Sequence, residues 1–283
     1  MGTSYDGSLV FLSVTVAVIA SYVALDLASR LAASQGSRAA RYWLAGGAVS
    51  MGVGIWSMHF IGMLALRMPI AMGYDVSVTL VSLAIACLAS GFALHTVNHG
   101  SLGIGRLAGA GILMGAGIGA MHYTGMAAMP IRPSIRYDLP LLAVSVLIAI
   151  AASVAALWIT FQLRSGTVRS TFRTRAAAAM VMGLAISGMH YTGMAAAHFA
   201  PDSICTVAGQ NIDNVWLAGI VGVFAVMFLA ATLAISLVDV RLTDRTARFA
   251  EEAHQRNLIL ARQTDELAQA NRVPEQEMDE RTR

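Results

Sequence analysis

Long apolar stretches alternate with short polar connections over the first 240 residues of the chain. The apolar stretches cover residues 8–29, 42–66, 76–97, 104–129, 139–163, 174–198 and 215–237. Each is about as long as the roughly 20 residues that a helix needs to cross the hydrocarbon core of a bilayer. None shows the alternation of a barrel strand, and lipid offers the backbone no hydrogen-bond partners. The pattern predicts an all-α polytopic membrane protein with seven transmembrane helices.

Composition agrees with this prediction. Hydrophobic residues make up 57% of the 283 residues and charged residues only 12%, with a mean hydropathy of +0.64. An ordinary soluble domain is much more polar. We therefore expect a multi-pass protein of the plasma membrane, with the lipid bilayer as its main environment.

Arginine placement predicts the orientation, because arginines in short loops favour the cytoplasmic side. The first, third and fifth connections contain Arg30, Arg38, Arg41, Arg106, Arg164, Arg169, Arg173 and Arg175. The second, fourth and sixth contain only Arg67, Arg132 and Arg136. The N-terminus is therefore expected outside and the C-terminus in the cytoplasm. No basic cluster is interleaved with aromatic residues in a soluble segment, so we expect no nucleic-acid partner.

Three predicted helices carry one short motif near their ends. Its copies read MHFIGM at 58–63, MHYTGM at 121–126 and MHYTGM at 189–194, and a Met-Gly pair starts seven residues before each copy. The spacing predicts a leading helix followed by three helical-hairpin repeats. The three motif helices then run in the same direction, which places the three histidines at one depth near the outer face.

Imidazole and thioether groups are ligands that suit copper, whereas the motifs contain no carboxylates for calcium or magnesium. Residues four apart share a helix face, so each histidine lies beside the methionine that follows it. The candidate metal ligands are His59, His122, His190, Met58, Met63, Met121, Met126, Met189 and Met194. The alternative is a duplicated packing motif, in which methionine fills the core and each histidine is only hydrogen-bonded.

These residues resemble the MHYT family of bacterial integral membrane sensors, named for the Met-His-Tyr-Thr string at 121–124 and 189–192. The resemblance covers residues 1 to about 240. It implies a signal-transduction role in the bacterial inner membrane, with protein-bound copper that senses oxygen, carbon monoxide, nitric oxide or redox state. The first copy departs from the family string at Phe60 and Ile61, so we expect its hydroxyl contacts to be lost.

Four hydroxyl side chains of the other two copies are expected to support the site rather than bind the metal. They would hydrogen-bond an imidazole or a bound diatomic molecule, and hydrogen bonding between helices is the alternative. These residues are Tyr123, Thr124, Tyr191 and Thr192. His198, two turns beyond His190 at the outer end of the predicted helix 174–198, is a candidate relay for metal that arrives from outside.

The chain is expected to divide into a seven-helix domain at 1–238 and a charged cytoplasmic helix at 239–283. An imperfect apolar seam along the second part predicts a coiled coil that binds a second copy or a signalling partner. A solvated amphipathic helix is the alternative. Proteins similar to this one often continue into an output enzyme, but no catalytic motif occurs here, so we expect no enzyme activity.

Two other functions fit the same histidines. A copper transporter would use stacked methionines and histidines as a path, and would need further ligands toward the cytoplasmic side. A haem-binding membrane redox protein would use two of the histidines as axial ligands.

Overall fold

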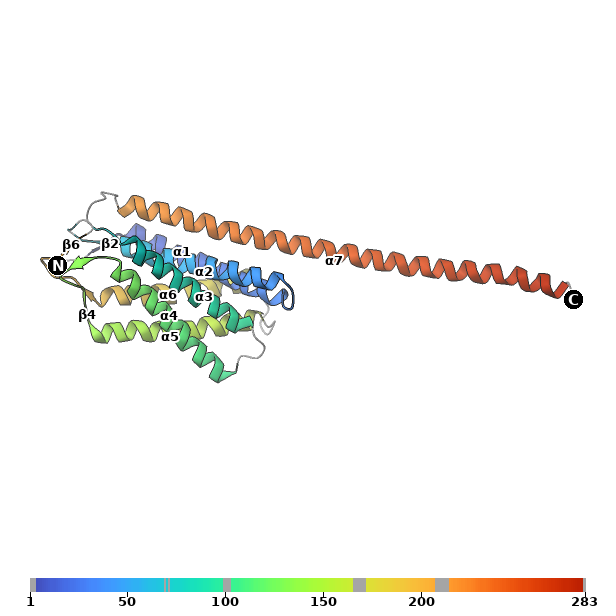
Figure 1. The fold of residues 1–283 in the computed structure, drawn as a ribbon, viewed down its shortest axis with the longest axis horizontal. Helices are drawn as coiled ribbons and strands as arrows, with labels where there is room; N and C mark the ends of the chain where they lie inside the picture. Colours follow the sequence, from blue (N-terminus) through green and yellow to red (C-terminus); the bar gives the residue numbers. More distant parts are fainter. Residues whose placement is uncertain are drawn as a thin grey trace. The chain divides into compact units, whose positions relative to one another are not determined.

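The computed structural model describes residues 4–68, 70, 72–98, 103–164, 172–206 and 214–281, and in them the fold is all-α, as predicted (Figure 1). The seven helices are α1 Gly7–Ala33, α2 Ala39–Leu64, α3 Val76–Asn98, α4 Ile104–Ala127, α5 Leu139–Arg164, α6 Phe172–Ala195 and α7 Asn214–Arg281. Six two-residue strands lie in the connections: β1 Ser4–Tyr5, β2 Leu66–Arg67, β3 Ile131–Arg132, β4 Arg136–Tyr137, β5 Ala197–His198 and β6 Ile204–Cys205. They pair antiparallel as β1 with β2, β3 with β6 and β4 with β5.

Six of these helices are long and apolar enough to cross a membrane, one fewer than predicted. The exception is α6, although its 24 residues equal the length of α4. Its first turn contains Arg173 and Arg175, and its last turns contain the polar motif. The polar residues at both ends therefore lower the mean hydropathy of α6.

The chain forms two compact units, residues 1–233 and 234–283. In the first unit, each of the helices α1 to α6 packs against the next, and α1 also packs against α6. These six helices therefore make a closed ring. In the second unit, α7 continues as one helix whose side chains at 241–267 are all exposed.

Three helix pairs of the ring approach closely at matched glycines. A Cβ added to Gly52 of α2 would lie 2.6 Å from the Cα of Cys87 in α3. The same contact joins Gly115 of α4 to Ile150 of α5 at 2.6 Å, and Gly183 of α6 to Val18 of α1 at 2.8 Å. Small residues let helix backbones pack at this distance in membranes. At these glycines α2 packs against α3, α4 against α5, and α6 against α1. The first helix of the chain therefore completes the third helix pair.

Three aspartates connect the starts of α1, α3 and α5 to the ends of the motif helices α2, α4 and α6. Asp6, Asp75 and Asp138 precede α1, α3 and α5, and each side chain accepts a hydrogen bond from a backbone N–H of the first turn. Each aspartate N–H also donates to a carbonyl just beyond the end of a motif helix, at Ala65, Ala128 and Ala196, over 2.8, 2.8 and 2.9 Å. Such N-caps satisfy donors that a helix start leaves free. The bundle end where α2, α4 and α6 finish is thereby tied together, and we call it the motif end.

Candidate metal centre

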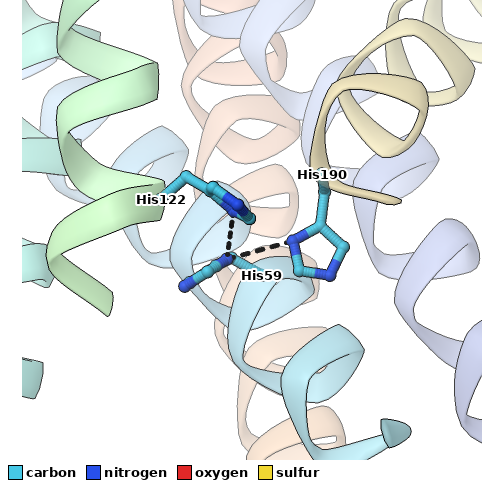
Figure 2. Close-up of side chains that lie close together, drawn as sticks. All are labelled: His59, His122 and His190. Carbon is cyan, nitrogen blue, oxygen red and sulfur yellow. Dashed lines mark hydrogen bonds between the residues drawn. The ribbon is translucent and has the colours of Figure 1, made fainter. Parts of the chain in front are cut away.

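The three motif histidines meet in the interior of the ring near the motif end (Figure 2). Their side chains come from α2, α4 and α6, and none is more than 1% exposed. The Nδ1 atom of His59 lies 3.0 Å from that of His190 and 3.1 Å from that of His122. Within the described residues, these three form the one group of histidine, cysteine and carboxylate side chains close enough to share an ion. The predicted convergence of the imidazoles is present in the structure.

The arrangement of ring nitrogens suits a cation. A neutral imidazole has one hydrogen and one lone pair, on different nitrogens. The Nδ1 of His59 therefore cannot donate to one neighbour and accept from the other. Either the rings share hydrogens, with the Nδ1 of His59 acting only as donor or only as acceptor, or a cation receives a lone pair from all three rings. The second arrangement is that of a three-histidine metal site.

The Nε2 side of each imidazole lies against the motif glycine of another motif helix, so the three contacts form a cycle. A Cβ added to Gly125 of α4 would lie 2.2 Å from His59 Nε2, and one added to Gly193 of α6 would lie 2.4 Å from His122 Nε2. Gly62 of α2 stands in the same relation to His190, at 2.2 Å. No side chain larger than hydrogen fits at these three positions. Each motif helix therefore provides one imidazole and the space for its neighbour's imidazole.

The motif methionines divide into two groups. Met63, Met126 and Met194 are buried in one cluster, one helical turn beyond the histidines, together with Met129. Their thioethers therefore lie between the histidines and the motif end. The structure brings these three predicted ligands together on one side of the histidines.

Met58, Met121 and Met189 instead lie in three separate clusters. Met58 packs with Ala17 of α1, Met121 with Ala86 of α3, and Met189 with Ala149 of α5. A residue next to a histidine points about 100° away from it around the helix. These methionines fill the interfaces between neighbouring helices, and the structure does not gather them at the histidines.

The motif tyrosines bond serines of neighbouring helices. The hydroxyl of Tyr123 lies 2.6 Å from Ser145 Oγ on α5, and that of Tyr191 lies 2.7 Å from Ser13 Oγ on α1. Thr192 donates to the carbonyl of Gly188 within its own helix. The two tyrosine contacts are hydrogen bonds between helices, the alternative given above, whereas the bond of Thr192 stays within α6 and fits neither expectation.

In the first repeat, which has Phe60 instead of a tyrosine, Trp56 makes the hydrogen bond to a serine of the neighbouring helix. This contact was not predicted from the sequence. The Trp56 indole N–H donates to Ser82 Oγ on α3 over 3.1 Å, and its ring stacks on Phe60 at 5.2 Å. Ser82 occupies the place on α3 that Ser13 and Ser145 occupy on α1 and α5. The polar contact that Phe60 cannot make is therefore made by Trp56, one turn earlier in the same helix.

A repeated Tyr-Asp pair, also missed, covers the motif aromatics. Tyr5 contacts Tyr191, Tyr74 contacts Phe60 and Tyr137 contacts Tyr123, with ring centroids 5.8, 5.0 and 5.4 Å apart. Burial raises the pKa of Tyr74, and it raises the pKa of Tyr137 to about 12. The sequence signal was available, because each tyrosine directly precedes one of the three N-capping aspartates.

His198 lies outside the helix in which we expected it. α6 ends at Ala195, and His198 belongs to β5, where it pairs with Arg136 and is exposed. Its Nδ1 lies 3.2 Å from the carbonyl oxygen of Ala196. The residue is therefore a surface group at the motif end.

Comparison with known proteins adds independent findings. A family model described as MHYT, bacterial signalling protein N terminal repeat, matches residues 52–110, 115–172 and 183–250. The chain is 52% identical over 255 residues to the bifunctional diguanylate cyclase/cyclic di-GMP phosphodiesterase MucR of Pseudomonas aeruginosa, which is 90% of this chain and 37% of that protein. It is 39% identical to signaling protein YkoW of Bacillus subtilis, over 70% of this chain and 25% of that protein.

A further relative is the cyclic di-GMP phosphodiesterase NbdA of Pseudomonas aeruginosa, 37% identical over 78% of this chain and 28% of that protein. The chain thus spans little more than a third, or less, of the length of these curated relatives. No solved structure matches it.

Proposed function

Because the chain belongs to the MHYT family of bacterial signalling proteins, we propose that it senses a diatomic gas or redox state through copper held by His59, His122 and His190. It is a bacterial membrane sensor region with three motif repeats. The observation that carries the proposal is the meeting of three buried Nδ1 atoms around His59.

Copper is the metal that the surroundings favour. Imidazoles suit copper and zinc alike, but thioethers are soft ligands that favour Cu(I), and Met63, Met126 and Met194 lie one turn away. Bound copper would supply an open coordination position for a diatomic molecule. The three histidines would hold it, and the buried methionines, with the half-buried tyrosines of the motif, would exclude water from it.

In the proposed orientation the motif end faces the outside and all seven helices span the membrane. The arginine bias of the connections supports this direction. Length supports the seventh span, because α6 matches α4 and takes part in the same ring. A gas or a reductant would then reach the centre from the periplasmic side or through lipid.

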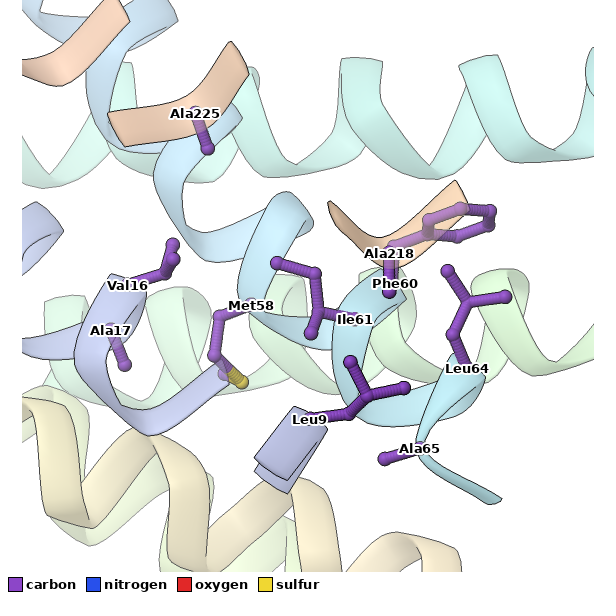
Figure 3. Close-up of a cluster of buried hydrophobic side chains, with 10 residues drawn as sticks. All are labelled: Leu9, Val16, Ala17, Met58, Phe60, Ile61, Leu64, Ala65, Ala218 and Ala225. Atoms are coloured by element: carbon purple, nitrogen blue, oxygen red, sulfur yellow. The ribbon is translucent and has the colours of Figure 1, made fainter. Parts of the chain in front are cut away.

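The signal leaves through α7. Met58 and Ile61, which flank His59 on α2, pack in one cluster with Ala218 and Ala225 of α7 (Figure 3). Farther along, Ser50 and Thr232 hydrogen-bond over 3.0 Å. A shift of α2 at the histidine layer would therefore move α7 directly, since packed interfaces transmit displacement.

Residues 239–283 would carry the signal to a second copy or to a signalling partner. Leu242, Phe249, Leu260 and Leu267 are between 56% and 67% exposed there. Two of the relatives act on cyclic di-GMP by name, so turnover of cyclic di-GMP is the output that we assign to the signal. The region itself has no catalytic role in this proposal.

Carbon monoxide provides a test of sensing. Copper(I)-loaded protein should show an infrared band from bound carbon monoxide, and the band should vanish in the triple variant His59→Ala, His122→Ala, His190→Ala. Gly188→Ala is a matched control in α6, since a Cβ there meets nothing within 4 Å. An unchanged band in the triple variant would refute the proposal.

Metal transport is a second candidate, favoured by one observation. Met51, Met114 and Met182 border one cavity on the side of the histidines away from the motif end, so thioethers lie on both sides of the histidine layer. Copper flux into proteoliposomes would favour transport over sensing. A haem is disfavoured, because imidazoles whose nitrogens lie 3.0 Å apart leave no room for a porphyrin between them.

A further inference from the structure

A cavity of about 40 Å³ lies in the ring beyond the histidine layer, on the side away from the motif end. Its wall repeats three times, with Ile55, Ile118 and Ile186 four residues before the histidines and Met51, Met114 and Met182 eight residues before them. At 1.5 Å per residue, the isoleucines lie about 6 Å from the histidines along their helices. The remaining wall consists of alanines and serines of α1 and α5.

The wall chemistry is unsuited to water. Ordered water in a protein needs about two to four polar partners. The wall has two hydroxyls, and that of Ser21 already donates to the carbonyl of Ala17. The other, Ser153 Oγ, is buried without a hydrogen-bond partner among the described residues. Apolar cavities of this kind stay dry and take up apolar guests such as xenon.

The volume limits the guest to a very small molecule. A cavity of about 150 Å³ holds benzene, and this one has roughly a quarter of that space. A second cavity of about 30 Å³ shares Met51, Met114 and Met182 with the first and continues toward Ala93 and Val97 of α3. Methionine is unbranched and adaptable, so the three side chains can move aside between the two spaces.

We propose that this cavity is a docking site for a neutral, apolar molecule of two or three heavy atoms, the class to which dioxygen belongs. It holds such a molecule one to two helical turns from the histidine layer and raises its local concentration there. This consequence for the histidines rests on the proposed function, whereas occupancy of the cavity does not.

Xenon tests the site directly. Crystals of the full chain pressurised with xenon should show an anomalous peak between Met51, Met114 and Met182. The variant Ala152→Leu, which fills the cavity, should lose the peak, and Ala155→Leu, on an exposed face of the same helix, should keep it. The triple histidine-to-alanine variant should also keep it, so failure of the metal assignment leaves this result unchanged.

Two outcomes would overturn the proposal. One is a wild-type crystal without xenon in the cavity at a pressure that labels lipid-facing sites, and this needs no folded variant. The other is an undiminished peak in Ala152→Leu, which would place the xenon elsewhere. Metal content of the same samples reports on the proposed function separately.

Discussion

Gly193 of α6 lies against the imidazole of His122 of α4, so closely that a Cβ at this glycine would come within 2.4 Å of Nε2. The same relation joins the other two glycine-histidine pairs around the ring. The glycine of the motif is therefore part of the centre as much as the histidine is. It sets how near the three rings can come.

Gly193→Ala should displace the His122 ring and weaken metal binding. Overpacking of this kind also costs about 1–3 kcal/mol of stability. Metal content and thermal unfolding of the extracted protein measure the two effects. Gly188→Ala, in the same helix with open space at its Cβ, should change neither, and equal behaviour of the two variants would contradict the steric role of Gly193.

Trp56→Phe should lower the free energy of unfolding by about 1 kcal/mol, the usual contribution of one hydrogen bond. The ring can still stack on Phe60, but Ser82 loses the indole donor. Chemical denaturation measures the loss. Tyr42→Phe, at a 79% exposed position, serves as the control, and a loss no greater than its own would exclude a role for the indole N–H.

Asp6 should make stability depend on acid pH. Hydrogen bonds from Ser8, and then the guanidinium of Arg67, lower the pKa of Asp6 to about 2, against about 3.9 for a free aspartate. Its ionised form therefore stabilises the fold fully above about pH 4, and the stabilisation is lost as pH falls toward 2. The gap in Tm between wild type and Asp6→Asn should narrow over that range.

Asp202→Asn, in an exposed turn, controls for removal of any one carboxylate. A gap between wild type and Asp6→Asn that stays constant from pH 6 to pH 2 would show that the Asp6 contacts do not act through its charge.

Ala225→Leu should disturb the contact between α7 and α2. Ala225 is fully buried beside Met58 and Ile61, so a larger side chain should cost about 1–3 kcal/mol. Thermal unfolding measures the cost. Val223→Leu, two residues earlier and 66% exposed, should be nearly neutral, and similar melting of both variants would argue against the proposed packing of α7.

The motif spacing was sufficient to predict the histidine layer. His59, His122 and His190 stand at the same place in three like-directed helices, and helix geometry converts that into a common depth. The cluster of Met63, Met126 and Met194 follows from the same geometry, because residues four apart share a face.

Contacts between helices could not be predicted in this way. Periodicity does not reveal which neighbour a face meets, so α1 was not expected as the partner of α6, and Met58 was not placed at an interface with α1. Trp56 escaped notice because it stands outside the motif string, in one repeat of three. The helix predicted to end at His198 ends at Ala195, because Ala197 and His198 form β5 and pair with β4.

The central claim is that three imidazoles hold one metal ion. Elemental analysis of the membrane-extracted protein tests it most directly, by comparison of wild type with the triple variant His59→Ala, His122→Ala, His190→Ala. The account predicts about one copper per chain in wild type, as expected for one shared site, and none in the variant that still inserts into the membrane. Wild-type protein without metal, or full copper occupancy in the triple variant, would contradict it.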